Sequence, residues 1–582
     1  MTEVIASPVT ARAADAPARP LTTLVDDYLA RHRDLSAVER FGQRHADAER
    51  PLHERWYRDL LPATPPGPGQ QYRFEVDLDA CTGCKSCVAA CHALNGLDEG
   101  ESWRSVGTLQ GANGTPVLQT VTTACHHCVE PACLAGCPVD AYEKDPVTGI
   151  VRHLDDQCIG CSYCTFTCPY EVPRFNERLG VVRKCDMCAG RLAAGEAPAC
   201  AQACPTGAIA IGVVDTSELV AAATETADAA LVPGAPPSAV TVPSTAYRRR
   251  RPLPPDAHAT DRWSEVPRAA HRPLVAMLVL TQVAVGALVA HLGAEWLLAD
   301  TALAGQRRAT ALLTALTGLV ALGASVFHLG RPRYAWRAVL GLRHSWLSRE
   351  VVAFGAFGAL SAAYAASTLW PGGGGGGAGG SGWPPTGLVD VVRALAAASG
   401  VAGVACSVLV YTVTGRRWWR PRRTASAFLA TAATGGLAAL LALVTLSGVA
   451  DGDPAELDRV VPPVGAALAG ASALVLAAEA AALVAGRRGG RLGGPPDAAR
   501  SAALLVGPLA RTTTVRFAAG AVGGVVVPAA LAAADYGPPA PPRGLVAGAG
   551  VAALALVVMG ELAARTLFFR AELGPRMPGV PR

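Results

Sequence analysis

Charged residues are scarce in this chain. Asp, Glu, Lys and Arg make up 17% of its 582 residues, and the formal net charge is only +5. No basic stripe with interleaved aromatic residues occurs, so a nucleic-acid partner is not expected. The first 20 residues contain neither an apolar core nor an Arg-Arg pair, so we predict no secretory or twin-arginine signal. We therefore expect that nothing in this chain exports its N-terminal half.

Apolar residues, in contrast, make up 51% of the chain and are unevenly spread. The chain is too long for one domain, and its long apolar blocks begin near residue 269. The sequence predicts four parts: a partly helical N-terminal extension (1–70), a cysteine-rich domain (71–213), an Ala- and Pro-rich tether (214–268) and a membrane anchor domain (269–582). In the extension, Ser36 and Glu39 have the spacing of a helix-capping box. This extension is expected either to pack on the cysteine-rich domain or to dock a partner.

Sixteen of the 17 cysteines fall in four groups of four. The groups are Cys81, Cys84, Cys87 and Cys91; Cys125, Cys128, Cys133 and Cys137; Cys158, Cys161, Cys164 and Cys168; and Cys185, Cys188, Cys200 and Cys204. The first and third groups have the C-x2-C-x2-C-x3-C spacing of a bacterial [4Fe–4S] site. Three closely spaced thiolates can wrap one face of the cube, and the fourth must come from elsewhere. The spacing therefore predicts iron–sulfur clusters.

Zinc is the main alternative for these cysteines. Four-cysteine zinc sites use CxxC pairs separated by a spacer, and the fourth group alone fits that pattern. The other groups crowd their cysteines too tightly, and zinc gives no reason for four such groups in succession. Sixteen thiols in such tight loops also indicate a metal framework rather than disulfides.

The predicted fold has a soluble half and a membrane half. Residues 72–78 and 208–213 have the pattern of strands on either side of the cysteine groups, which predicts an α+β ferredoxin-like double module. After residue 269 we count eight apolar spans of the length that a bilayer requires, about 20 residues each. They lie near 273–297, 309–330, 350–370, 388–414, 424–449, 461–486, 516–535 and 543–567. We therefore predict that the module is fused to an all-α membrane bundle of about eight helices.

Arginines gather in alternate loops of the predicted membrane domain. The basic loops contain Arg331, Arg333, Arg337, Arg343 and Arg349; Arg416, Arg417, Arg420, Arg422 and Arg423; and Arg487, Arg488 and Arg491. The positive-inside rule places these loops and both ends of the membrane domain in the cytoplasm, although Arg307 and Arg308 oppose this orientation. We therefore predict a multi-pass protein of the cytoplasmic membrane. Its cysteine-rich domain is expected on the cytoplasmic side, where a reducing compartment suits free thiols.

Two ionisable residues at the ends of predicted spans are candidates for quinone chemistry. His328 lies near the end of the second span, and Glu350 begins the third. A histidine can bond a quinone oxygen, and a carboxylate can take a proton that a quinol releases. The alternative is that His328 caps a helix and that Glu350 pairs with an arginine.

The other polar residues of the membrane half do not indicate a specific function. His291 lies within the first span, but well-placed histidines are too few for a bis-histidine anchor of two haems, so haem is not favoured. Glu479 and Glu561 are expected to be buried partners or to lie near an interface. Cys406 is expected to be a small packing residue.

Three cysteine-containing runs resemble the four-cluster electron-transfer subunit of the dimethyl sulfoxide reductase family of molybdoenzymes. They are CHHCVEPACLAGCPVDAY (125–142), CIGCSYCTFTCPYEVPRFN (158–176) and KCDMCAGRLAAGEAPACAQACP (184–205), and the resemblance covers about 75–213. The membrane half resembles the eight-span anchor subunit of that family, best at FHLGRPRYAWRAVLGLRHSWLSREV (327–351). In the family these are usually two chains, whereas here they are fused.

The resemblance implies a subunit that passes electrons between membrane quinone or menaquinol and a separate molybdopterin-containing catalytic subunit. Nothing in this chain resembles a pterin-binding domain. The family pattern implies four [4Fe–4S] clusters, with one ligand of each cluster supplied by a different group. The implied sets are Cys81, Cys84, Cys87 and Cys204; Cys185, Cys188, Cys200 and Cys91; Cys125, Cys128, Cys133 and Cys168; and Cys158, Cys161, Cys164 and Cys137. It also implies that His328 and Glu350 serve the menaquinol site.

Orientation and partner leave alternatives open. The well-known members of the family work outside the cytoplasmic membrane, in contrast to the orientation predicted here, so the direction of electron flow stays open. One rival hypothesis is that the chain serves a hydrogenase or a formate dehydrogenase. Another is an ion-translocating module driven by the clusters, which predicts paired charges deep in several spans. A transporter with an accessory metal domain is disfavoured, because the spans show no clear repeat.

Overall fold

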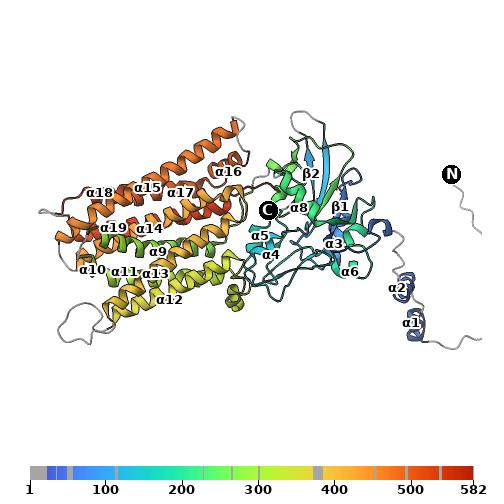
Figure 1. The fold of residues 1–582 in the computed structure, drawn as a ribbon, viewed down its shortest axis with the longest axis horizontal. Coiled ribbons are helices and arrows are strands. Elements are labelled where there is room, and N and C mark those ends of the chain that lie inside the picture. The colour runs from blue at the N-terminus through green and yellow to red at the C-terminus, as the bar shows by residue number, and fades with distance from the viewer. Residues whose placement is uncertain are drawn as a thin grey trace, which may run out of the picture.

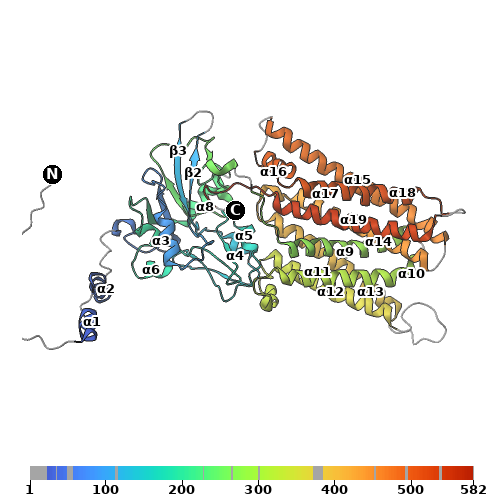
Figure 2. The same ribbon diagram turned by 180° about the vertical axis from the view of Figure 1, so that it is seen from behind.

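The computed structural model describes residues 23–33, 36–48, 57–111, 116–226, 228–263, 266–298, 302–370, 385–450, 454–491, 496–536 and 541–580. A domain of strands and short helices adjoins one end of a bundle of long helices, which run along the long axis of the molecule (Figure 1). We call the first part the cysteine domain and the second the helix bundle. The view from behind in Figure 2 shows the same arrangement, with α4 and α5 beside the bundle and α3 and α6 away from it.

The N-terminal helices α1 (Leu24–Arg33) and α2 (Ala37–Asp47) extend from the side of the cysteine domain remote from the bundle (Figure 1). The predicted capping box is confirmed, because Ser36 Oγ accepts the Glu39 backbone N–H and the Glu39 carboxylate accepts that of Ser36. Their described side chains are mostly exposed, and an ion pair of 3.8 Å joins His45 of α2 to Glu196 of the cysteine domain.

Two three-stranded sheets frame the cysteine domain. The first has the order β8-β1-β9, with β1 (Gln70–Asp77) antiparallel to β8 (Ile209–Asp215) and parallel to β9 (Ala246–Arg248). The second has the order β10-β2-β3, formed by β10 (His258–Ala259), β2 (Ser105–Gln110) and β3 (Leu118–Thr123). The two strands predicted on either side of the cysteine groups are thus direct neighbours. Phe74 and Val76 of β1 point into the core, which fixes the register of this pair.

Short elements carry the cysteines between these sheets. They are α3 (Ser86–Leu94), α4 (Ala132–Gly136), the hairpin of β4 (Tyr142–Lys144) and β5 (Val151–His153), α5 (Tyr163–Thr167), the hairpin of β6 (Arg174–Asn176) and β7 (Val181–Arg183), α6 (Ala189–Ala193) and α7 (Ala199–Gln202). Helix α3 contacts α7, and α4 contacts α5. The first cysteine group therefore lies beside the fourth, and the second beside the third.

The segment 214–268, expected to be a tether, is instead folded onto the cysteine domain. It contains α8 (Thr216–Glu225), η3 (Ser238–Val240) and η4 (Thr260–Trp263) as well as β9 and β10. Two of its buried polar side chains contact His126: Ser244 Oγ donates to the His126 carbonyl at 2.7 Å, and Thr245 Oγ1 lies 2.9 Å from His126 Nδ1. The Ala- and Pro-rich composition hid these elements, because their stability comes from pairing with distant strands.

The helix bundle contains eight helices long and apolar enough to cross a membrane among the described residues, as predicted. Its elements are α9 (Arg272–Leu298), α10 (Ala302–Gly305), α11 (Arg307–Phe327), η5 (Pro332–Val339), α12 (Trp346–Leu369), α13 (Thr386–Thr412), η6 (Arg417–Trp419), α14 (Pro421–Ala450), α15 (Pro454–Arg491), α16 (Pro496–Val506), α17 (Ala510–Ala521), η7 (Val522–Val526), α18 (Val527–Ala533) and α19 (Arg543–Arg570). The seventh span joins α17 and α18 through η7, a π-helical turn.

Helix α9 is central to the bundle and contacts α11, α13, α14 and α19. A Cβ atom at Gly286 would lie 1.9 Å from the carbonyl oxygen of Ala432, so α9 and α14 approach backbone to backbone. Small residues at such a crossing allow membrane helices to pack without lipid between them.

After the last span the chain returns to the cysteine domain. Met577 is fully buried in the same core as Val76, Leu109 and Val121. A Cβ on Gly107 of β2 would lie 2.2 Å from the backbone nitrogen of Gly579, so only glycine permits this approach. Residues 571–580 therefore form a C-terminal clasp across the cysteine domain, which the sequence did not predict.

Candidate iron–sulfur sites and quinol site

Four cysteines of one implied set line a single cavity in the cysteine domain. Cys125, Cys128, Cys133 and Cys168 all face it, together with Tyr170 and Lys184. Cys168 comes from a different group than the other three, as the family pattern requires. We call these four the third set.

A second implied set lies beside it, next to the helix bundle. Burial raises the pKa of the Cys137 thiol to about 11, against backbone N–H groups that lower it, and nearby Cys158 raises it further. Burial also raises the pKa of the Cys164 thiol, and the nearby sulfur atoms of Cys161, Cys137 and Cys158 raise it further when they are charged. We call Cys137, Cys158, Cys161 and Cys164 the membrane-side set.

The remaining eight cysteines lie away from the bundle. Burial raises the pKa of the Cys91 thiol to about 12, against the opposing charge of Arg104, while neighbouring Cys200 and Cys188 raise it further. Burial likewise raises the pKa of Cys87, whose neighbours include Cys200 and Cys204. We call Cys91, Cys185, Cys188 and Cys200 the second set, and Cys81, Cys84, Cys87 and Cys204 the outer set.

Backbone N–H groups point at cysteine sulfur atoms in several sets. The distances to Sγ are 3.3 Å from Ala141 to Cys137, 3.3 Å from Gly160 to Cys158, 3.4 Å from Met187 to Cys185 and 3.3 Å from Ala208 to Cys204. Such donors stabilise thiolates that ligate iron. Within the described residues no three His, Cys, Asp or Glu side chains converge on one point to hold a single ion. In a cubane, each thiolate binds a different iron, and the residues present fit that group.

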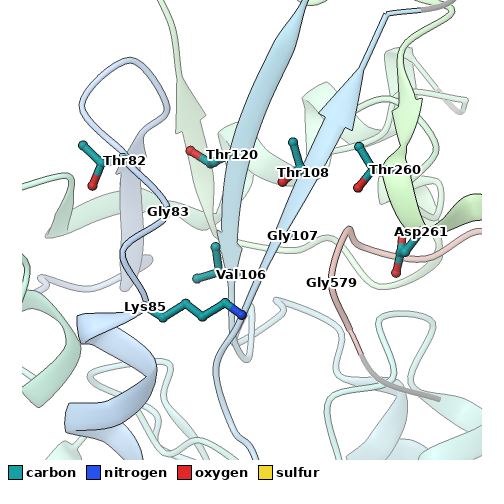
Figure 3. A pocket seen from close by; sticks show the side chains of 10 residues that line it. All are labelled: Thr82, Gly83, Lys85, Val106, Gly107, Thr108, Thr120, Thr260, Asp261 and Gly579. Carbon is teal, nitrogen blue, oxygen red and sulfur yellow. The ribbon is translucent and has the colours of Figure 1, made fainter.

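The outer set reaches the surface beside the start of α3. Cys84 is exposed, whereas Cys87 is buried. Thr120 Oγ1 of β3 donates to the Cys81 carbonyl at 2.6 Å and so fixes the first cysteine loop. A polar pocket opens beside this loop, between Thr82 and Lys85 on one side and β2 and the C-terminal clasp on the other (Figure 3).

The membrane-side set is fixed to the bundle through backbone contacts. The Gly330 N–H donates to the Gly160 carbonyl at 3.2 Å, and the Arg331 N–H donates to the Ile159 carbonyl at 3.0 Å. From the same loop, His344 Nε2 lies 3.0 Å from the carbonyl oxygen of Cys137. This loop, 328–345, therefore holds two of the four cysteines of the set in place.

A buried ionic network also joins the two parts. Arg416, between α13 and α14, pairs with Glu171 at 3.2 Å and with Glu572 of the C-terminal clasp at 3.0 Å. Arg268 contacts the same two carboxylates. All four side chains are largely buried, so removing one cation would leave an uncompensated charge, at a cost of about 3–5 kcal/mol.

Glu350 is 3% exposed in the first turns of α12, where the Ser407 hydroxyl of α13 donates to its carboxylate. It is not paired with an arginine among the described residues. Tyr163 of α5 is near both Glu350 and the membrane-side set. Burial raises the pKa of its phenol, and the charges of Glu350 and Cys161 raise it further. The Tyr163 hydroxyl donates to the Val410 carbonyl at 2.6 Å.

His328 is the C-cap residue of α11, at the same end of the bundle. Its Nδ1 is buried and has no hydrogen-bond partner within the part of the chain that the structure describes, and burial lowers the pKa of the ring to about 4. His271, at the start of α9, is a charged neighbour that lowers it further. Among the described residues no hydrogen bond or ion pair joins His328 to Glu350, so the structure does not bring the two candidates into direct contact.

The other membrane polar residues are engaged in local contacts. Arg516 of the seventh span bonds Glu479 of α15 at 2.9 Å and Glu561 of α19 at 2.7 Å. Thr431 also donates to Glu561, at 2.6 Å. His291 Nε2 lies 3.1 Å from the Leu303 carbonyl oxygen. Glu479 and Glu561 are therefore partners of the same buried arginine, as one of the two expectations for them stated.

Several residues that shape these sites carried no signal in the sequence. Tyr163, Ser407 and Arg104 became visible only through contacts between elements far apart in the chain. The close spacing of the cysteines, by contrast, was sufficient to predict the thiols that are assigned to the four sets.

Two regions of the chain match known families. Residues 117–214 match the family described as 4Fe-4S dicluster domain, and residues 269–370 match the family described as DMSO reductase anchor subunit. The thiosulfate reductase electron transfer subunit PhsB of Salmonella typhi is 40% identical over 153 residues, which are 26% of this chain and 79% of that protein. The B subunit of the anaerobic dimethyl sulfoxide reductase of Escherichia coli (strain K12) is 38% identical over 154 residues, 25% of this chain and 75% of its own length.

The iron–sulfur subunit of the nitrate-inducible formate dehydrogenase of the same organism is also similar, at 34% identity over 171 residues, but 58% of its length is covered. The matches therefore do not favour the formate dehydrogenase or ion-translocation hypotheses. The iron–sulfur and anchor regions occur in one polypeptide, as the resemblance in the sequence indicated. This chain belongs to the dimethyl sulfoxide reductase family, and it is a fused electron-transfer and membrane-anchor subunit of a molybdopterin oxidoreductase.

Proposed function

We propose that the cysteine domain holds four [4Fe–4S] clusters, one in each of the four sets. The observation that best supports this proposal is the cavity lined by Cys125, Cys128, Cys133 and Cys168, three from one group and one from another. When bound, such clusters carry single electrons. The chain supplies thiolate ligands, N–H donors to sulfur and a buried environment that excludes water.

The order of the sets gives a path from membrane to surface. The membrane-side set adjoins the bundle, the third and second sets follow, and the outer set ends at the exposed Cys84. Cys185 of the second set has Cys125 of the third set as a charged neighbour, which supports this order.

We propose that quinol is oxidised, or quinone reduced, at the bundle end next to the membrane-side set. Glu350 is the group that exchanges a proton with the quinone oxygen, and Ser407 orients its carboxylate. The neutral ring of His328 supplies a hydrogen bond at the same end of the bundle. Tyr163 and Glu350 both bond α13, through the Val410 carbonyl and Ser407, which supports a short route from this site to the nearest cluster.

The catalytic partner is proposed to be a separate subunit that carries molybdopterin and docks at the outer set. The relatives with the best coverage are subunits of dimethyl sulfoxide and thiosulfate reductases by name, which supports such a partner. Exposure of the Cys84 loop beside the polar pocket supports docking at this end of the cysteine domain (Figure 3).

Metal analysis of the gently purified complex tests both proposals. We expect about 16 iron atoms per chain, together with molybdenum or tungsten from the partner. Iron near 16 without either metal would contradict the molybdopterin partner if the partner polypeptide is present in the same sample. Iron near 12 would contradict the proposal of four clusters.

We propose that the cysteine domain lies on the cytoplasmic side of the membrane. The loops with Arg331 and Arg416 lie at the same end of the bundle as this domain, which agrees with the positive-inside rule. Arginines of these loops also donate hydrogen bonds to carbonyl groups of the cysteine domain. Contact with that domain is therefore a second reason for arginines at this end of the bundle, besides membrane orientation.

Reporter fusions in the loops at the two ends of the bundle decide the orientation. A fluorescent protein inserted after Gly493, next to the basic end of α15, is expected to fluoresce, and alkaline phosphatase at the same place is expected to be inactive. The matched insertion at Gly375, which follows α12 in the sequence, should give the reverse pattern. Active phosphatase after Gly493 would place the cysteine domain outside.

A further inference from the structure

Arg104, immediately before β2, is a buried cation in the middle of the cysteine domain. Its exposed fraction is 2%. Its guanidinium lies over the Phe74 ring, 4.7 Å from the centroid, and Nη1 donates to Thr122 Oγ1 at 3.2 Å. Its Nη2 is buried without a hydrogen-bond partner.

This guanidinium has no carboxylate to balance it among the described residues, where no ion pair includes Arg104. A buried, unpaired charge is costly, and a guanidinium does not escape that cost by losing its proton. Some other negative group must therefore offset the charge in the folded protein.

The anions that the described surroundings of Arg104 offer are cysteine thiolates. Cys87, Cys185 and Cys200 pack in the same buried cluster as Phe74, the ring over which Arg104 lies. Burial works to lower the pKa of Arg104, but the thiolates of these three cysteines and of Cys91 raise it above its ordinary value. These four cysteines belong to the outer and second sets. The membrane-side set contributes none of them.

A hydroxyl group connects Arg104 to one of these thiolates. Thr122 Oγ1, which accepts the bond from Arg104, lies 3.5 Å from Cys87 Sγ. Arg104 thus lies one hydrogen-bonded group away from the outer set, and Phe74 prevents it from turning away.

We propose that Arg104 is the shared counter-cation of the two clusters farthest from the membrane and raises the reduction potentials of both. This inference rests on the four clusters proposed above. Each added electron makes a cluster more negative, and a fixed positive charge in a medium of low dielectric constant favours that reduced form. Arg104 binds no substrate. It acts on the clusters through its positive charge alone.

Redox titration of the full chain in its own membranes, followed by electron paramagnetic resonance, tests this inference. In Arg104→Gln, two of the four cluster signals should titrate at lower potential, each with its reduction equilibrium weakened about tenfold or more, which is about 59 mV for one electron. Arg104→Lys keeps the charge and should restore most of the shift. Arg178→Gln removes a charge whose side chain is 64% exposed, and it should leave all four potentials unchanged.

A second variant addresses the hydrogen-bonded link. Thr122→Val retains Arg104 but breaks its connection to Cys87, so it should lower the potential of the outer cluster alone. If Arg104→Gln loses iron, this variant decides the matter, and an unchanged outer potential then overturns the inference.

The possible results distinguish a failure of the proposed role of Arg104 from a failure of the proposal of four clusters. Four unchanged potentials in an Arg104→Gln protein with about 16 iron atoms would overturn the role of Arg104 but leave the four clusters intact. A parent protein with fewer than four cluster signals and less iron would instead overturn the proposed function. A shift confined to the two clusters nearest the membrane would also contradict the inference.

Discussion

Replacing Glu350 with glutamine is expected to slow quinol-dependent electron transfer by about a hundredfold or more, while all cluster signals and the iron content stay unchanged. General acid–base groups contribute about 10²–10⁴-fold to proton-transfer steps. Glutamine fills the same buried space and still bonds Ser407, but it cannot take up a proton. Turnover with a soluble quinol analogue, measured on membranes of each variant, gives the comparison.

Glu295→Gln is the matched control for this change. Glu295 is also a largely buried carboxylate of the bundle, but it pairs with Arg307 and Arg393 at the end remote from the cysteine domain. It should leave quinol turnover within a few fold of the parent. His328→Asn should also slow turnover, because it removes the ring whose Nδ1 lacks a partner. Normal turnover in both Glu350→Gln and His328→Asn would refute the assignment of the quinol site.

Replacing Cys204 with serine is expected to change the signal of the outer cluster, not that of the second cluster. The reason is the exchange of ligands that the family pattern implies: Cys204 belongs to the fourth group but is assigned to the cluster of Cys81, Cys84 and Cys87, and the helices α3 and α7 that carry these groups are in contact. Where the altered site loses its cluster, iron falls by about four atoms per chain. Electron paramagnetic resonance of the reduced protein identifies the signal that changes.

Three further cysteine variants test the pairing. Cys84→Ser should alter the same signal as Cys204→Ser, whereas Cys188→Ser and Cys91→Ser should together alter a different one. If Cys204→Ser and Cys188→Ser change the same signal, each group supplies its own four ligands and the implied exchange is wrong.

Local patterns in the sequence predicted the parts of this protein that depend on nearby residues. The cysteine spacing predicted the candidate metal ligands, and the apolar runs located the eight spans found among the described residues. The alternation in 72–78 and 208–213 found β1 and β8, since both strands have one face in the core. The capping box at Ser36 is likewise confined to four neighbouring residues.

What escaped prediction depends on contacts between distant segments. Strand β9 has only three residues, and its parallel pairing with the distant strand β1 stabilises it. That pairing leaves no local pattern in the sequence, so the Ala- and Pro-rich surroundings suggested a tether instead. Arg416 was interpreted only as a marker of membrane orientation, whereas it also balances Glu171 and Glu572. Arg104 stands in an unremarkable run of sequence, and only its burial without a carboxylate distinguishes it.

The C-terminal clasp sets the order in which this protein can be completed. Met577 and Val580 fill the core of a domain whose first strand was synthesised some five hundred residues earlier. Until the ribosome has made all eight helices, that core lacks two of its side chains and Gly107 lacks the backbone that covers it. The cysteine loops therefore remain in an unfinished domain until the described residues that follow α19 have been made and close over β2.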